Sequence, residues 1–265
     1  RYAWDFDPHM DIFRLDLEGR ERLFRRLEDG PDDRPTFGSP TEPGALVRLT
    51  DAPADELVSV VLAVRSVELE RDNGDIEEFT FSPAREIDIA SLVNGQTVTL
   101  LDNVRVEEGT FRNVRIRFQT EDGPQSPFVT AENGRVLRVE FIEARATAPV
   151  SFTLDQGDRR AITVDMDLRR SLLLNDNDLA NDRIRMRPRA RASLDDRAGI
   201  LQGQVSSGLV NQANCLPAVY LYDGEDVTPT RLTANPGPLT SMLVRDRNTN
   251  PNYAFHAIPD GRYTI

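Results

Sequence analysis

Short runs of alternating apolar and polar residues, repeated from residue 45 onward, limit the fold of this chain more than any other feature. In residues 162–168, apolar side chains alternate with Thr163, Asp165 and Asp167. The same alternation places four apolar residues on one predicted face, at Val58, Val60, Leu62 and Val64. Turn pairs such as Asn73-Gly74 separate the runs. Because a period of two is that of a strand with one buried and one wet face, we predict an all-β chain, built as an antiparallel β-sandwich of the immunoglobulin or transthyretin type.

The composition bounds the class of protein and its partners. The 265 residues are enough for two domains, and 39% of them are hydrophobic, enough to form a core. No run of about 18 apolar residues occurs, so no segment predicts a membrane-spanning helix. All 32 basic residues are arginine and the net charge is −12. Since an acidic protein repels phosphate groups, nucleic acid is not expected as a partner.

Two changes of pattern divide the chain. Residues 1–44 form an N-terminal variable segment that ends in the linker-like GSPTEPG. Residues 45–197 hold the predicted β-sandwich, and residues 198–265 hold a second, smaller β-sandwich. The sequence RYTI begins a strand at the end of residues 198–265. We therefore expect a missing strand of the small domain to come from outside these residues, either from a continuation of the chain or from a neighbouring subunit.

The stretch LTDAP raises the question whether Asp51 serves catalysis or ends a strand. Pro53 has no N–H to give to a β-ladder, so it stops strand pairing. An aspartate just before such a stop can accept backbone N–H bonds in a turn. A catalytic carboxylate would need a second acid in an open pocket. We therefore interpret Asp51 and Pro53 as structural residues.

Asp165 and Asp167 stand two residues apart on one predicted strand and so project from the same face. Two carboxylates in this arrangement could hold a cation, because hard ions prefer oxygen ligands. Arginine is plentiful in the chain, and cross-strand pairing with arginine is the alternative. We favour the pairing and interpret both residues as structural.

The acidic stretch NDNDLAND offers a second candidate for metal binding. Its carboxylates Asp176, Asp178 and Asp182 are spaced as Ca²⁺ ligands of a loop could be. An EF-hand loop that began at Asp176 would need glycine and glutamate where Asn181 and Arg187 stand. We favour an ordinary polar loop and keep a Ca²⁺ site as the alternative. No other cofactor is predicted.

The stretch RIRMRPRAR is the most regular in the chain. Alternation predicts one strand face that carries five arginines, namely Arg183, Arg185, Arg187, Arg189 and Arg191. Such a face could bind an acidic glycan or a lipid phosphate through bidentate guanidinium bonds. The alternative, which we favour, is a ladder of ion pairs with acids such as Asp165 and Asp167. Pro188 in the middle indicates a sheet edge or a bulge.

Four stretches in this order carry a resemblance to a known family: GALVRLTDAPADELVSVVLAVRSVELER, EIDIASLVNGQTVTLLDNVRVEEGTFRNVRIRF, AITVDMDLRRSLL and RIRMRPRAR. Together they resemble the family called domain of unknown function 4382, which is found in exported bacterial lipoproteins. The resemblance implies that Gly109 keeps the turn glycine of the family pattern. It also implies that Asp165-Met166-Asp167 replaces the usual Asp-Phe-Asp, with Met166 pointing inward.

Residues after 198 resemble small transthyretin-like or carboxypeptidase-regulatory-like β-domains. Relatives with this domain carry a second cysteine beyond the last strand, which implies a disulfide partner for Cys215 outside these residues and an oxidising compartment. The two resemblances together imply an exported protein that is periplasmic, extracellular or associated with the outer membrane. Contact with a membrane is expected only through a lipid anchor, which these residues do not contain.

Three functions are consistent with the sequence. The one we favour is a non-catalytic structural or interaction module, which binds a protein partner or itself through sheet edges. The second is a module that binds a polysaccharide or another anion on the arginine-rich strand. The third is a hydrolase with a pair of carboxylates. The nucleophile-elbow, P-loop, dinucleotide-binding and zinc-protease motifs do not occur in the sequence.

Overall fold

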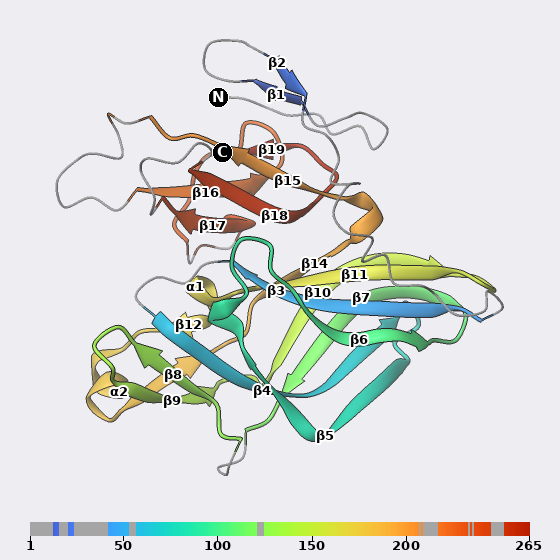
Figure 1. The fold of residues 1–265 in the computed structure, drawn as a ribbon, viewed down its shortest axis with the longest axis horizontal. Helices are drawn as coiled ribbons and strands as arrows, with labels where there is room; N and C mark the ends of the chain where they lie inside the picture. Colours follow the sequence, from blue (N-terminus) through green and yellow to red (C-terminus); the bar gives the residue numbers. More distant parts are fainter. Residues whose placement is uncertain are drawn as a thin grey trace.

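The computed structural model describes residues 42–52, 57–120, 125–206, 217–232, 236–244 and 252–265, together with the single residues 208 and 234. It also places the backbone of two short N-terminal strands, β1 (Phe13–Leu15) and β2 (Glu21–Leu23), which pair in antiparallel fashion. The predictions made for Pro53 and Cys215 fall outside the described residues. Figure 1 shows a large β-structure, with a smaller one beside it.

The larger sheet has eight strands and is organised around β4 (Leu57–Arg71). One side of β4 pairs with β5 (Ile76–Asp88). The other side pairs first with β7 (Gly109–Phe118) and then with β8 (Phe128–Ala131), so β8 continues the line of β7 after a loop. The remaining strands are β9 (Val136–Phe141), β10 (Arg145–Leu154), β12 (Leu172–Leu173) and β13 (Arg183–Met186).

The second sheet has four strands in the order β14 (Ala190–Leu194), β11 (Arg159–Asp167), β3 (Gly44–Ala52) and β6 (Val98–Arg105). The pair β11 and β3 is parallel, as is the pair β13 and β9 in the larger sheet. All other strand pairs described are antiparallel. The prediction of an all-β sandwich is confirmed, with these two parallel pairs as additions.

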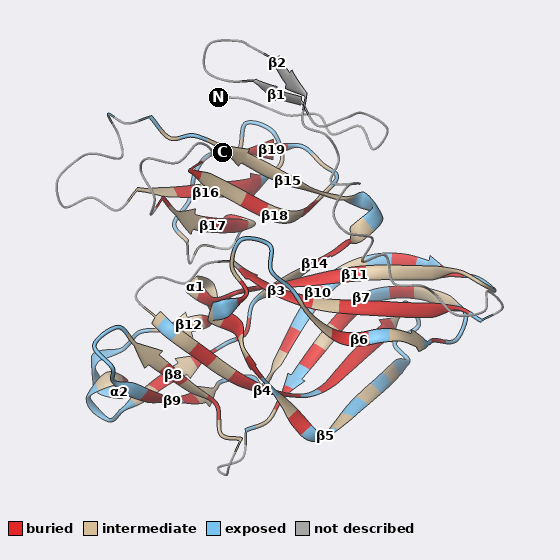
Figure 2. Ribbon diagram, in the orientation of Figure 1, coloured by how far each residue is buried: buried red, intermediate tan, exposed pale blue. Residues whose placement is uncertain are grey.

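The core lies between the two sheets. Figure 2 shows buried residues along β3, β4 and β11, the strands at the centre of the sandwich. Val60, Leu62 and Val64 are fully buried, as their alternation predicts. Val58 is 62% exposed, so the prediction for this residue is wrong. The reason is a register shift between Leu57 and Ser59, because a bulge turns the side chains before it to a different face.

Short helical turns join several strands. The 3₁₀ turn η1 (Ile89–Ser91) precedes β6, and it lies where helical spacing around Ile89 occurs in the sequence. The helices α1 (Leu168–Ser171) and α2 (Asp176–Ala180) lie between β11 and β13. A second 3₁₀ turn, η2 (Asp195–Arg197), leads from β14 into the following strand. Among the described residues, every helix is too short or too polar to cross a membrane.

Among its described residues, the smaller unit after η2 has five strands in two sheets. One sheet pairs β15 (Ala198–Gly203) with β18 (Tyr253–Pro259). The other has β16 (Ala218–Asp223) between β17 (Thr240–Leu243) and β19 (Tyr263–Thr264). Its apolar core is separate from that of the large sandwich and contains Val219, Leu221, Val244, Phe255, Ile258 and Tyr263.

Candidate functional site

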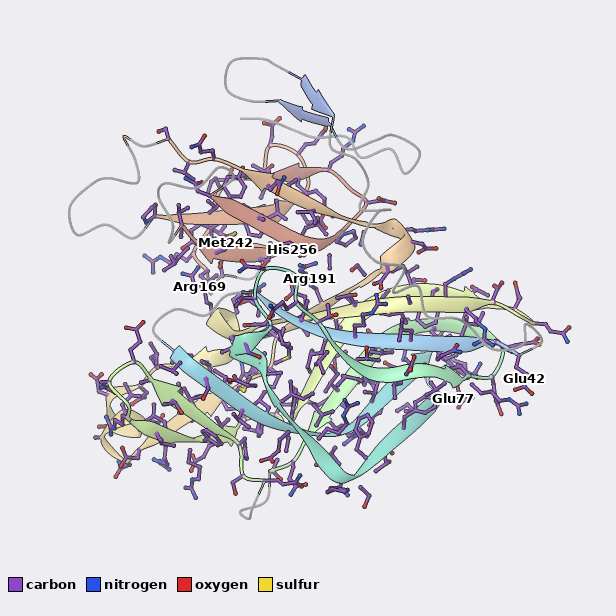
Figure 3. The ribbon with its side chains drawn as sticks, viewed as in Figure 1. Glu42, Glu77, Arg169, Arg191, Met242 and His256 are labelled. Atoms are coloured by element: carbon purple, nitrogen blue, oxygen red, sulfur yellow. The ribbon has the colours of Figure 1, made fainter. Side chains whose placement is uncertain are left out.

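Arg191 is the centre of the contact between the large sandwich and the small unit. It lies on β14 directly opposite Asp165 on β11, and its Nη2 forms an ion pair with that carboxylate. The same Nη2 donates to the carbonyl of His256 at 2.7 Å, and Nη1 donates to the carbonyl of Ala257, both in β18. Figure 3 shows Arg191 facing His256 of the small unit. Asp165 thus takes part in the cross-strand arginine pair that the sequence favours, and that arginine also holds the small unit.

A cavity of about 20 Å³ lies beside this contact, which is room for one water molecule. The residues that line it come from both units and include Thr50, Asp165, Arg191, Ser241 and His256. Burial lowers the pKa of His256, and the nearby charge of Arg191 lowers it further. The imidazole is therefore neutral at physiological pH, and the cavity is too small for an organic substrate.

Helix α1 adds two more arginines to the contact between the units. Arg169 donates from Nη1 to Ser241 Oγ at 3.0 Å, and Arg170 donates from Nη1 to the carbonyl of Pro238 at 2.7 Å. Both acceptors belong to the small unit. Three arginines of the large sandwich thus point toward polar groups of its neighbour, and two of them bind backbone carbonyls.

Asp167 determines where α1 begins. Its side chain accepts the backbone N–H of Arg170 at 3.0 Å, as the N-terminal cap of the helix. Burial is the main cause that raises the pKa of Asp167 to about 6, and the N–H bond and the charge of Arg170 oppose this effect. The expected cross-strand pairing of Asp167 with the arginine stretch is therefore wrong, because the chain turns into α1 at this residue and its carboxylate caps the helix.

Asp51 lies at the end of β3 and is 5% exposed. Its Oδ1 accepts the backbone N–H of Leu168 at 3.4 Å, so the carboxylate joins β3 to the start of α1. The expected acceptance of a backbone N–H is present, but the donor belongs to a distant segment instead of a turn beside Asp51. This carboxylate positions the helix that carries Arg169 and Arg170.

The arginine stretch does not form one strand. Arg183 and Arg185 lie on β13 in the larger sheet, whereas Arg191 lies on β14 in the smaller one. Arg187 and Arg189 are exposed in the connection between them. The prediction of a single face with five arginines is therefore wrong, because the chain passes from one sheet to the other around the buried Pro188.

The carboxylates of the predicted calcium loop lie against arginines. Asp178, in α2, contacts Arg183 at 3.2 Å and Arg185 at 2.7 Å. Asp182 contacts Arg135 at 2.6 Å. Asp176 lies in the first turn of α2. Among the described residues, no three His, Cys, Asp or Glu side chains are arranged to hold a metal ion. Calcium binding by these residues stays the untested alternative to an ordinary polar loop.

Two buried glutamates on β4 form a network that we did not predict. Glu68 and Glu70 are 1% and 4% exposed. Arg115 on β7 contacts Glu70 at 2.5 Å, Arg112 contacts it at 2.6 Å, and Arg117 forms an ion pair with Glu68. The hydrogen bond from Arg112 is the main cause that lowers the pKa of Glu70. Alternate acids in VELE and alternate arginines in FRNVRIRF were the available signal. It could be used only by someone who had predicted that these two strands pair.

Gly109 begins β7 at the turn that the family pattern implies, with φ of 153°. The guanidinium of Arg71 fills the place that a side chain would take there. Arg71 donates to the carbonyls of Glu108 at 2.6 Å and Glu107 at 3.2 Å, and it lies 4.7 Å from the centre of the Phe111 ring. Glycine is needed at this turn both for its backbone conformation and for the approach of Arg71.

The fold and these contacts define a two-part, all-β protein in which a large sandwich holds a smaller β-unit through arginine. Residues 45–188, more than half of the chain, match the family model described as Domain of unknown function (DUF4382), and the chain belongs to that family. Neither the curated proteins nor the solved structures contain a match to this chain.

Proposed function

We propose that this protein is a non-catalytic structural and interaction module that binds a protein partner through the edge of β5. One observation carries the proposal. Strand β5 has 13 residues and pairs with β4 on one side, and no other described strand pairs with its outer edge. Figure 1 places β5 at the periphery of the large sandwich. Unpaired backbone groups on a long edge are a template for strand addition.

The side chains of β5 indicate which partner would fit. Phe79 and Phe81 pack against the core, which keeps the strand in place. Glu78, Thr80 and Glu86 are exposed. A second copy of β5 would bring like charges together, whereas a strand with arginine or lysine would meet opposite charges. We therefore propose a partner strand with basic residues, and self-association is the alternative that the experiment distinguishes.

The state of the buried carboxylates supports a role without catalysis. A hydrolase of the carboxylate-pair type needs one acid that is protonated near neutral pH, in a site open to substrate. Glu68 and Glu70 are instead buried against arginines, which keep the pKa of Glu70 low. Asp165 is buried against Arg191. Glu68, Glu70 and Asp165 thus have the electrostatics of structural ion pairs, whereas Asp167, whose pKa burial raises to about 6, is a buried helix cap.

The proposal extends to the place where the protein works. We infer that it is exported, to the periplasm, the outer membrane or the cell exterior, and that a lipid anchor holds it where it meets a membrane. The resemblance of the chain to exported lipoproteins supports this placement. We also propose that the small unit is a transthyretin-like domain, supported by its two small sheets around one core.

Site-specific photo-crosslinking tests the proposal in the native cell. A benzophenone side chain at Thr80, exposed on β5, should give an adduct with one partner protein. The same side chain at Thr147 is the matched control, because Thr147 is exposed on the edge strand β10, which lies beside β14 of the other sheet.

An adduct from position 80 that is absent from position 147, and that the substitution Ser82→Lys abolishes, supports a partner on this edge. An adduct of twice the mass of the chain identifies the partner as a second copy. Equal adducts from both positions, or none from either, contradict the proposal.

A further inference from the structure

On the face of the larger sheet that points away from the core, opposite charges meet across β7 and β4, but like charges meet across β4 and β5. Glu68 of β4 lies opposite Arg115 of β7 and also forms an ion pair with Arg117. On its other side, Glu68 lies opposite Glu78 of β5. Like charges directly opposite each other are unfavourable in a sheet. The edge strand thus ends a charge pattern with an acid beside an acid.

Glu78 is exposed, and within the described part of the chain it forms no ion pair. By contrast, the neighbouring Glu68 and Glu77 each form an ion pair with an arginine. The hydrogen bond with Glu68 is the main cause that raises the pKa of Arg117, and the charge of Glu78 raises it further. The cation that responds to Glu78 is therefore already bonded to another acid, and the charge of Glu78 is left over at the edge.

We propose that the strand bound at β5 carries an arginine or lysine opposite Glu78 and apolar side chains on the face that covers Phe79. The inference rests on the proposed function, and it adds the order of side chains in the partner strand. A cation opposite Glu78 continues the alternation of charge by one more strand. A second copy of β5 centred on Glu78 would place two glutamates opposite each other, so the same charge selects against self-association.

The other residues of β5 give the apolar half of the pattern. Phe79 and Phe81 pack against the core but are only half-buried. Because side chains alternate between the faces of a sheet, partner residues opposite these two share the inner face and would cover the rings. On the outer face, Ile76 is 46% exposed and lies two residues from Glu78. An apolar partner residue opposite Ile76 would bury this side chain as well.

The pairing of β5 with β4 limits the length of the template. Residues Ile76–Thr80 pair with β4 without a shift of register. Pro83 follows and has no N–H to donate to a ladder. Antiparallel addition is expected, because an antiparallel pair is slightly more stable than a parallel one. In that direction the hexapeptide VTVRTV places its arginine opposite Glu78 and its valines opposite Phe81, Phe79 and Ile76.

Fluorescence anisotropy of the labelled peptide VTVRTV with the full chain tests the inference. The native chain should bind this peptide at least about fivefold more tightly than VTVETV, because the first meets an opposite charge and the second a like charge. Glu78→Arg should reverse the order of the two peptides, and Glu78→Gln should abolish the difference. The peptide STSRTS, in which serine replaces the valines, should bind at least about tenfold more weakly than VTVRTV.

Glu86→Arg is the matched control. Glu86 is exposed on the same strand, beyond Pro83 and opposite Ala63, so the same change of charge there should leave the order of the peptides unchanged. The changed side chains are exposed, so each variant should melt at the temperature of the native chain.

Equal affinity of the native chain for VTVRTV and VTVETV overturns the inference, as does no binding of either peptide at millimolar concentration. A preference that Glu78→Arg leaves unchanged, or that Glu86→Arg alters as strongly, overturns it too. Crosslinking at Thr80 separates this failure from that of the proposed function. An adduct at Thr80 without any preference among the peptides refutes the charge pattern and leaves a partner on this edge.

Discussion

The large sandwich and the small unit are stabilised in different ways. The sandwich has a continuous core between two sheets, in which strands such as β3, β4 and β11 bury one whole face. The small unit buries only six described residues in its own core. Small cores contribute little net stability, so a unit of this kind gains more from its surroundings. We infer from this comparison that the order of the small unit depends on the sandwich beside it.

Arginines of the sandwich donate the hydrogen bonds that are described here between the two units. Arg169, Arg170 and Arg191 of the sandwich donate to Ser241, to the carbonyl of Pro238, and to the carbonyls of His256 and Ala257. Such bonds depend on geometry, since a donor moved by an ångström no longer reaches its acceptor. The contact therefore sets the orientation of the small unit, whereas apolar burial stabilises the fold of the sandwich.

The largest effect is expected inside the sandwich core. Phe111 is fully buried, stacks on Phe152 and lies under the guanidinium of Arg71. Phe111→Ala removes this packing and should lower the free energy of unfolding by about 3–5 kcal/mol in urea denaturation. The control Val58→Ala, at an exposed valine, should change it by less than about 0.5 kcal/mol. Equal effects of the two substitutions would contradict the core described for the sandwich.

The second effect is expected at the contact between the units. Arg191→Ala leaves the carboxylate of Asp165 buried without its arginine and should cost about 3 kcal/mol. Calorimetry should also resolve a separate, earlier transition for the small unit, because Arg191 no longer holds the carbonyls of β18. Arg189→Ala, at an exposed arginine two residues away, is the control. A single transition in Arg191→Ala at the temperature of the native chain would refute the coupling.

A comparable effect on the free energy of unfolding, which depends on pH, is expected at Asp167. Burial raises the pKa of Asp167 in the folded protein to about 6, above its ordinary value of 3.8. The folded state thus binds this proton more tightly, so its contribution to stability is full below pH 3.8 and is lost as pH rises through about 6. Asn is neutral and also caps helices. Asp167→Asn should therefore stabilise the protein at pH 7 by about 3 kcal/mol, since the shift from 3.8 to about 6 is about two pKa units and one unit corresponds to about 1.4 kcal/mol.

Urea denaturation at pH 4 and pH 7 checks this sign. The gain from Asp167→Asn should shrink between pH 7 and pH 4, because the native carboxyl is largely protonated at the lower value. The groups that face Asp167 are Arg170, Asp165 and Arg169, and both proteins contain them. A variant that is less stable than the native chain at pH 7 would show that the charge of Asp167 stabilises the fold.

The smallest effect is expected from calcium. Asp178 and Asp182 are already neutralised by Arg183, Arg185 and Arg135. A bound ion would have to displace these arginines, so the melting temperature should be the same in EDTA and in millimolar Ca²⁺. A clear rise with Ca²⁺, abolished by Asp178→Asn, would restore the calcium loop as a site.

The sequence predicts the elements better than the contacts between them. Alternation at Val60, Leu62 and Val64 predicts a strand with a buried face, because the period of a strand is a local property. It fails at Val58, where a bulge shifts the register, and bulges leave no mark in the apolar pattern. It fails again in the arginine stretch, where alternation continues through Pro188 although the chain changes sheets there.

The sites depend on pairings that are distant in the sequence. The ion pair of Arg191 with Asp165 was predicted from the acid and arginine residue types. The bonds of Arg191 to the carbonyls of His256 and Ala257 could not be predicted in this way, because every residue has a backbone carbonyl.

Hydrogen exchange tests most directly the claim that the sandwich orders the small unit. The variant Asp165→Asn with Arg191→Met removes the bonds of Arg191 to β18 without leaving the charge of Asp165 buried and unpaired. Amides of β16 (Ala218–Asp223), in the small unit, should then exchange at least about tenfold faster, while those of β4 (Leu57–Arg71) keep their protection. Equal protection of β16 in the variant and the native chain would contradict the claim that the bonds of Arg191 order the small unit.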